Sequence, residues 1–361
     1  MAEFDRKLVL ENGEEYPGFG FGAPVLGKVS ELVFQTSMMG YQEIVADPAY
    51  ACQTVVMTYS IIGNYGLTDD DTENRSWSAA GLVVREYNDK PSNFRYTKTL
   101  SEQMEENGVP GLAGVDTRKL TRILRDCGTM KAVMVEIDTP ASEALAAIAA
   151  AKLPENRVRE VSCEKRWHAR TANPVYNVVA IDCGGKTRAI RALNARRCNV
   201  TVVPWNTSAQ EITELHPDGL FVTSGPGDPN AVKETVETIR ALKGTLPIFG
   251  VGLGCTLAAL ACGAKTVCLP HGHHGGSTPV RNLKTNGIES TAQNHTYAID
   301  ADSLKESGLT VTYTNVMDGS VEGVENAAAK LIGVCFDPEG TDSPTVMAQF
   351  MTMLQKQKSG R

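Results

Sequence analysis

The sequence lacks the features of a membrane, secreted or nucleic-acid-binding protein. It contains no uninterrupted apolar run of about 18 residues, the length that a membrane-spanning helix needs. Its opening stretch, "MAEFDRKLVLENGEEYPG", carries charges where a signal peptide requires an apolar core. The formal net charge is -7, so there is no excess of basic residues to neutralise nucleic-acid phosphates. We therefore expect a cytoplasmic protein that binds neither membranes nor nucleic acid.

Closely spaced cysteine pairs are missing as well. The nine cysteines are scattered and include no C-x-x-C pair, which argues against a disulfide framework and a structural zinc site. Histidines gather at one place, "HGHHGG", which contains His271, His273 and His274. No carboxylate lies beside them in the sequence, and they do not have the i, i+4 spacing of metal ligands on a helix. We expect a glycine-rich loop there and no metal site.

The length of the chain, 361 residues, exceeds what one hydrophobic core supports, and a prior of about 150 residues per domain suggests two domains. Residues 1–140 mix strand and helix signals, so we expect an α+β domain. Its clearest helix signals are a capping box formed by Thr99 and Glu102 and a second helix start at Asp116. Residues 141–176 hold an alanine-rich helix and a polar stretch with little core pattern, which we expect to be a connector.

Residues 177–361 alternate short apolar strands with amphipathic helices. The strands end in the turns "DCGG", "PWN", "TSGPGDPN" and "GVGLGC". This alternation is typical of an α/β fold in which helices cover both faces of a mainly parallel sheet. Ligands bind such sheets at the carboxyl ends of the strands, so these turns mark the expected site. After residue 265 the pattern becomes mostly β, with one last helix.

The turn "FGVGLGC", which ends at Cys255, follows a buried strand and precedes a helix of small residues. A dinucleotide-binding loop would need a third small residue where Cys255 stands and an acidic residue roughly 20 positions later, and that acidic residue is missing. A nucleophile elbow, which lifts a Ser or Cys above a sheet, needs the glycines found here. At its apex, however, stands Gly252, which has no side chain. A tight turn without chemistry is the remaining interpretation.

Several long stretches carry a family resemblance. In the N-terminal half they are "TSMMGYQEIVADPAY", "GNYGLTDDD", "SNFRYTKTL" and "GVDTRKLTRILRDCGTMKA", and in the C-terminal half "PDGLFVTSGPGDP", "HGHHGGSTPVRN" and "AQNHTYAID". Together they resemble the small, glutamine-hydrolysing subunit of carbamoyl-phosphate synthetase, a class I glutamine amidotransferase. The resemblance covers nearly the whole chain. It implies an amidotransferase domain over 177–361 and a small-subunit domain over 1–140.

The resemblance also implies roles for single residues. In that family a cysteine in the elbow attacks the side-chain amide of glutamine, and a His and a Glu of a late "F-H-P-E" motif activate and orient it. The nucleophile position is Gly252, the His position is Asp337, and Glu339 is retained. The implied substrate contacts are Ser37, Gly225, Gly227, Leu253, Asn294 and Tyr297. Three further pocket positions are altered, namely Cys255, Thr256 and Thr296.

The resemblance therefore implies a small subunit that no longer hydrolyses glutamine. Its N-terminal domain would dock a large synthetase subunit, which would carry the ATP, Mg²⁺ and bicarbonate sites. This agrees with the absence of a G-x-x-x-x-G-K-[ST] loop from this chain, for which we expect no cofactor. The complex would make carbamoyl phosphate, for pyrimidine or arginine synthesis, from free ammonia. Gly252→Cys alone would not restore hydrolysis, because Asp337 cannot act as an imidazole base.

Two alternatives stay open. The chain could be a non-catalytic binding or regulatory module that senses glutamine or a related small amide. It could also be an active hydrolase in which Cys255, in the first helical turn, is the nucleophile and His295 or His273 is the base. Against the second alternative, Cys255 would lie roughly 4–5 Å along the helix from the position that the oxyanion hole serves.

Overall fold

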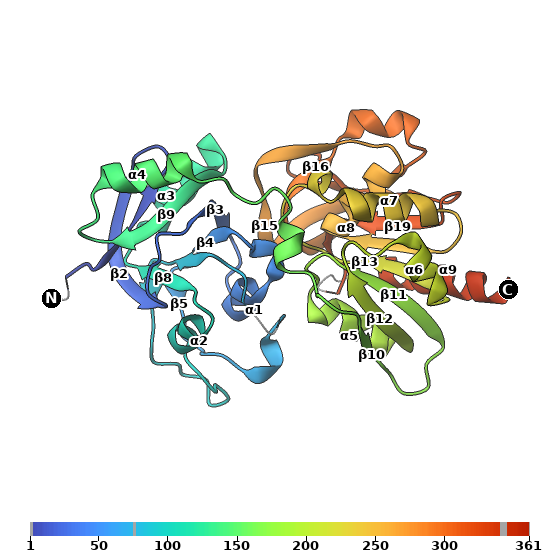
Figure 1. The fold of residues 1–361 in the computed structure, drawn as a ribbon, viewed down its shortest axis with the longest axis horizontal. Coiled ribbons are helices and arrows are strands. Elements are labelled where there is room, and N and C mark those ends of the chain that lie inside the picture. The colour runs from blue at the N-terminus through green and yellow to red at the C-terminus, as the bar shows by residue number, and fades with distance from the viewer. Residues whose placement is uncertain (1–2, 75–76, 340–344, 361) are drawn as a thin grey trace. The chain divides into compact units, whose positions relative to one another are not determined.

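The computed structural model describes residues 3–74, 77–339 and 345–360 (Figure 1). The chain forms two compact units, with the division between Pro154 and Glu155. Within the described residues, no helix is both long and apolar enough to cross a membrane.

The first unit is built on a closed β-barrel. Seven of the described strands close in the order β1, β2, β8, β6, β4, β3 and β9. Their bounds are Arg6–Leu10 (β1), Glu15–Gly22 (β2), Val29–Gln35 (β3), Gln53–Met57 (β4), Gly81–Val83 (β6), Pro110–Ala113 (β8) and Met130–Glu136 (β9). The described part of this unit also contains a small sheet and four α-helices, with bounds Ile61–Ile62 (β5), Glu86–Tyr87 (β7), Tyr41–Ala46 (α1), Leu100–Glu106 (α2), Thr117–Cys127 (α3) and Ala141–Ala150 (α4). The mixed α+β character is confirmed.

Two helices of this unit begin at the predicted caps. Before α2, Thr99 Oγ1 accepts the Glu102 N–H at 3.2 Å, and Glu102 Oε2 accepts the Thr99 N–H at 2.8 Å. Before α3, Asp116 Oδ1 accepts the Lys119 N–H at 3.0 Å. Each bond satisfies a backbone donor that the first helical turn leaves without a partner, which explains why the sequence located these starts correctly.

The second unit is built on one large sheet of eleven described strands. Their order is β10, β12, β11, β13, β14, β19, β18, β17, β15, β16 and β20. The parallel strands are Tyr176–Asp182 (β11), Cys198–Pro204 (β12), Gly219–Val222 (β13), Ile248–Val251 (β14) and Leu331–Val334 (β19). Antiparallel pairing joins the others, which are Trp167–Ala169 (β10), Thr266–Asn282 (β15), Ile288–Ile299 (β16), Thr310–Asn315 (β17), Val321–Asn326 (β18) and Phe336–Asp337 (β20). Parallel pairing is thus confined to five adjacent strands.

Helices cover both faces of this sheet, as the sequence predicts. One core cluster packs residues such as Ile212, Val236 and Leu257 against one face, and a second packs Leu193 and Phe350 against the other. The helices are Thr187–Ala195 (α5), Ala209–Glu214 (α6), Lys233–Leu242 (α7), Leu253–Ala261 (α8) and Thr345–Ser359 (α9). Because β11, β13, β14 and β19 are parallel neighbours, the turns at their carboxyl ends come together at one edge of the sheet.

The stretch 141–176 is divided between the two units instead of forming a separate connector. Helix α4 packs Ala144 and Ile148 against the barrel strands β1 and β9. Further along, Val158 is fully buried in the core of the second unit, and β10 pairs antiparallel with β12. The sequence pattern missed β10 because it has only three residues, too few to show a period.

Candidate functional site

A sharp turn at Gly252 joins β14 to α8. Gly252 has φ 56° and ψ −119°, a backbone conformation that residues with a side chain rarely adopt. Its N–H donates to the Val334 carbonyl at 2.8 Å, and its own carbonyl accepts the Cys255 N–H at 3.0 Å. The turn therefore has the strand, strained apex and helix that a nucleophile elbow requires.

The glycines around this apex are there because backbone segments approach closely. A Cβ atom on Gly250 would lie 2.3 Å from the Gly254 carbonyl oxygen, and one on Gly254 would lie 2.2 Å from the Val222 carbonyl oxygen. On Gly225, in the turn after β13, it would lie 2.0 Å from the Cys183 carbonyl oxygen. No side chain fits at these distances, so each position requires glycine.

The apex itself carries no reactive atom. A Cβ on Gly252 would lie 3.0 Å from Ser224 Cβ, so the turn after β13 faces the apex directly. Leu253 is the first residue of α8, and its N–H therefore has no acceptor within the helix. The glycine turn approaches this helix start, since a Cβ on Gly225 would lie 3.1 Å from Leu253 Cδ2. The oxyanion hole that the resemblance implies at Leu253 and the glycine turn, and the substrate contacts at Gly225 and Gly227, stay predictions.

Asp337 is held in a nearly buried ion pair. Its Oδ2 lies 2.6 Å from Lys186 Nζ, and each of the two side chains is 12% exposed. Arg188 lies farther away, with 3.9 Å between its guanidinium and the same oxygen. Lys186 comes from the turn after β11, directly before α5. The position that the resemblance gives to the catalytic imidazole is therefore a carboxylate neutralised by lysine.

Glu339 lies beside this ion pair. Burial and the negative charge of Asp337 raise the pKa of Glu339 to about 7, against the opposing effect of Arg188 and Lys186. Its Oε1 is buried and has no hydrogen-bond partner in the part of the chain that the structure describes. Because its pKa is about 7, this carboxyl group is only partly ionised near neutral pH. It also has no imidazole to orient, since position 337 is Asp.

Cys255 is fully buried beneath the turn. Its Sγ would lie 2.8 Å from a Cβ atom placed on Gly333 of β19, so the thiol is directed at the sheet. A hydrogen bond with Cys255, together with burial, raises the pKa of the Cys335 thiol well above its usual value. Thr256, the other altered residue of this turn, is also buried, and its hydroxyl donates to the Leu253 carbonyl at 2.8 Å. Cys255 is a core residue here, which disfavours its use as a relocated nucleophile.

The expected contacts on β16 belong to a histidine-rich hairpin. Asn294 Oδ1 lies 2.8 Å from Nδ1 of the buried His274, whose pKa burial lowers to about 4. Tyr297 accepts a hydrogen bond at its carbonyl from His295 Nδ1 at 3.0 Å. The Cα of Thr296 would lie 3.1 Å from a Cβ on Gly272 of β15, so the hairpin is closely packed at this residue.

Ser37 belongs to the first unit. It follows β3, and both its N–H and its hydroxyl donate to Gln35 Oε1, at 2.9 and 3.1 Å. Its role as a substrate contact stays a prediction.

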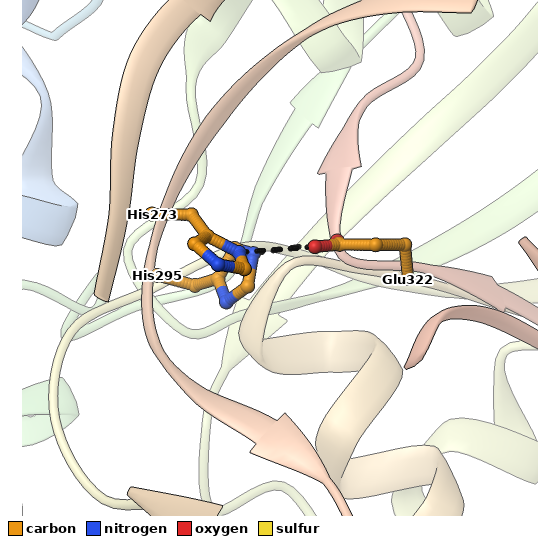
Figure 2. Close-up of side chains that lie close together, drawn as sticks. All are labelled: His273, His295 and Glu322. Carbon is orange, nitrogen blue, oxygen red and sulfur yellow. Dashed lines mark hydrogen bonds and ion pairs between the residues drawn. The ribbon is translucent and has the colours of Figure 1, made fainter. Parts of the chain in front are cut away.

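A second group of titratable side chains lies between this hairpin and β18, where His273, His295 and Glu322 meet (Figure 2). His273 Nδ1 lies 3.0 Å from Glu322 Oε1, and His273 Nε2 lies 2.9 Å from Asp318 Oδ2. Burial lowers the pKa of His273, but its bonds and charge interactions with Glu322 and Asp318 outweigh this effect and raise it overall. Neither carboxylate could be predicted from the sequence, because Glu322 is 49 residues from His273 and only the folding of the sheet brings them together.

Comparisons with known proteins agree on both halves of the chain. Residues 8–134 match the family model of the carbamoyl-phosphate synthase small chain, CPSase domain, and residues 179–354 match that of the class-I glutamine amidotransferases. A carbamoyl phosphate synthase small chain from Fusobacterium nucleatum is 44% identical over 94% of both chains. The small chain from Listeria innocua is 41% identical over 98% of both chains. The one from Chlorobaculum tepidum is 43% identical over 99% of this chain and 100% of the relative.

Proposed function

We propose that this chain, which belongs to the family of carbamoyl phosphate synthase small chains, is a small subunit that has lost glutamine hydrolysis. It would work in the cytoplasm with a large synthetase subunit that carries the ATP and Mg²⁺ sites. The pair would make carbamoyl phosphate from free ammonia, for pyrimidine or arginine synthesis. Support for the partner comes from the family, since residues 8–134 match the domain specific to these small chains.

The observation that carries the loss of hydrolysis is the apex of the elbow. The turn keeps its strained backbone and its glycines, but Gly252 has no atom that could attack an amide. Removal of a triad nucleophile usually costs on the order of 10⁶ in turnover. Lysine pairing at Asp337 supports the same conclusion, because this carboxylate is engaged with Lys186 and cannot take the role of an imidazole base.

The isolated chain provides the first test. It is incubated with glutamine, and ammonia release is measured in an assay coupled to glutamate dehydrogenase. A known glutaminase serves as the positive control. We expect no release above the rate without protein. In parallel, a diazoketone analogue of glutamine, which alkylates active-site thiols, should leave every cysteine unmodified in the intact mass. Ammonia release that disappears in Cys255→Ser would overturn the proposal in favour of an active hydrolase.

The partnership has its own test. Co-expression with the large subunit from the same genome, followed by size-exclusion chromatography, should give one stable complex. A small chain that elutes alone at every concentration would leave the family assignment in place and refute the proposed subunit role.

A further inference from the structure

Three strands of the second unit bring two histidines and a glutamate together. His273 on β15 is paired directly with His295 on β16, and Glu322 comes from β18. The two imidazole rings pack edge to face, with centroids 5.0 Å apart and an angle of 84° between their planes. Glu322 is completely buried, and Figure 2 shows both rings directed toward its carboxylate.

The partner of each outer ring nitrogen indicates where the hydrogens lie. His295 Nδ1 lies 3.0 Å from the Tyr297 carbonyl oxygen, which only accepts, so Nδ1 carries the hydrogen. In a neutral ring, Nε2 then presents a lone pair to Glu322 Oε2 at 3.4 Å. Neither of these two buried atoms has a hydrogen-bond partner among the described residues. A lone pair facing a carboxylate across this distance is repulsive, and either a metal ion between the two atoms or a proton on Nε2 removes the repulsion.

His273 has the same difficulty on the other side of the carboxylate. Its two ring nitrogens each face an oxygen of a carboxylate, Asp318 and Glu322, while a neutral imidazole has one hydrogen to donate. Asn315 does not relieve this. Its Oδ1 accepts the Met317 N–H at 2.8 Å, which fixes the amide so that Nδ2 points to Glu322 Oε1 at 3.1 Å and lies 3.4 Å from His273 Nδ1. An amide donor beside Nδ1 favours a lone pair there, with the hydrogen on Nε2 toward Asp318.

We propose that His273 Nδ1, His295 Nε2 and a Glu322 oxygen bind one divalent transition-metal ion of the zinc class. Two imidazoles and a carboxylate are donors that zinc commonly takes, with one position left for water. Metal–donor bonds of about 2.0–2.1 Å in a tetrahedron place donor atoms roughly 3.3–3.4 Å apart. His273 Nδ1 lies 3.0 Å from Glu322 Oε1, and His295 Nε2 lies 3.4 Å from Glu322 Oε2. One ring nitrogen of each histidine and one carboxylate oxygen lie within 4.8 Å of one another, so small movements of these side chains bring three donors to the spacing of a tetrahedral site.

The surroundings match a metal site in a second respect. Histidine ligands typically donate their other N–H to a carboxylate or a backbone carbonyl, which fixes the ring and its tautomer. Asp318 provides the carboxylate for His273, and Tyr297 the carbonyl for His295. A bound ion would tie the β15–β16 hairpin to β18. This inference does not depend on whether the chain hydrolyses glutamine.

The test uses the full chain, freed of metal by dialysis against a chelator and titrated with Co²⁺ and Zn²⁺. We expect about one equivalent of Co²⁺ to bind with the visible absorption of a tetrahedral site, and Zn²⁺ to displace it. Glu322→Gln, which keeps the shape of the side chain, should abolish this spectrum. Asp318→Asn should weaken Co²⁺ binding by roughly 10–100-fold. The control His271→Gln changes a neighbouring histidine of β15 outside the group and should bind as the wild type does.

Thermal unfolding provides a second readout. At a hundredfold excess of Zn²⁺ over its dissociation constant, the midpoint should rise by roughly 5–10 °C, and this rise should shrink as the pH falls because protons compete for the histidines. If Glu322→Gln does not fold, His273→Gln, at a position 11% exposed, replaces it. Absence of stoichiometric binding, or equal binding by wild type and folded variants, would overturn the proposal and assign the group to protonated histidines.

Discussion

Gly252→Cys restores the thiol that the family uses, and the structure predicts what it costs. At φ 56° and ψ −119° a side chain strains the backbone, which typically costs about 1–3 kcal/mol. The new Cβ would also lie 3.0 Å from Ser224 Cβ, closer than the roughly 3.5–4.0 Å of a favourable carbon contact. The free energy of unfolding should therefore fall by about 1–3 kcal/mol. For a unit of this size the thermal midpoint should fall by roughly 3–10 °C.

The variant should nevertheless release no ammonia from glutamine, because Asp337 remains paired with Lys186 and no imidazole base is supplied. Stability is measured by urea titration and calorimetry, and hydrolysis by the coupled ammonia assay. Gly252→Ala tests the backbone strain without the thiol. Its matched control is Gly263→Ala, at an exposed glycine with φ 94° and no atom within 4 Å of the added Cβ, which should destabilise less.

Two results would refute this reasoning. If Gly252→Ala were neutral or stabilising, the turn would not have the strained conformation described here. If Gly252→Cys hydrolysed glutamine well above background, the loss of the imidazole at Asp337 would not matter, and the apex glycine alone would explain the inactivity.

Three further predictions concern the residues around the turn. Lys186→Met leaves the nearly buried Asp337 carboxylate without its lysine partner and with the Arg188 guanidinium 3.9 Å away. It should lower the free energy of unfolding by up to about 3–5 kcal/mol in a urea titration, whereas the double variant with Asp337→Leu should recover most of that loss. Glu339→Gln should leave the free energy of unfolding unchanged near pH 4 and raise it by about 1–3 kcal/mol near pH 8. The reason is that the pKa of Glu339 is about 7 in the folded protein against the usual 4.5, so the wild type loses stability as the pH rises through this interval. An equal stability difference at pH 4 and pH 8 would contradict this. In the native protein a thiol reagent should modify the exposed Cys127 and leave the buried Cys255 unmodified. The Cys255→Ser variant should therefore have as many reactive thiols as the wild type. Mass spectrometry of the labelled peptides measures both.

Local features of the fold were predictable because their causes are local. The capping box at Thr99 and Glu102 depends on residues three positions apart, and the structure has it as predicted. The alternation of strands and helices after residue 177 likewise gave the helix-covered sheet. The turn at Gly252 could be recognised because close backbone contacts demand glycines at fixed spacing.

Features that depend on distant pairing could not be predicted in the same way. The barrel closes through the pairing of β1 with β9, which no short pattern specifies. Lys186 and Asp337 are 151 residues apart. Their ion pair exists only because the sheet brings the turn after β11 close to Asp337 in β20, the short strand that follows β19. The carboxylates beside His273 were missed for the same reason, since Glu322 comes from β18 and Asp318 from the turn between β17 and β18.

The most direct test of the central claim is nitrogen-donor use by the assembled enzyme. This chain is combined with its large subunit, and ATP-dependent carbamoyl phosphate synthesis is measured with either glutamine or ammonium as the sole nitrogen source. We predict synthesis from ammonium, and with glutamine no more than the large subunit gives alone. Synthesis from glutamine at a rate comparable to that from ammonium would contradict the proposal that this elbow, with Gly252 at its apex, no longer hydrolyses glutamine.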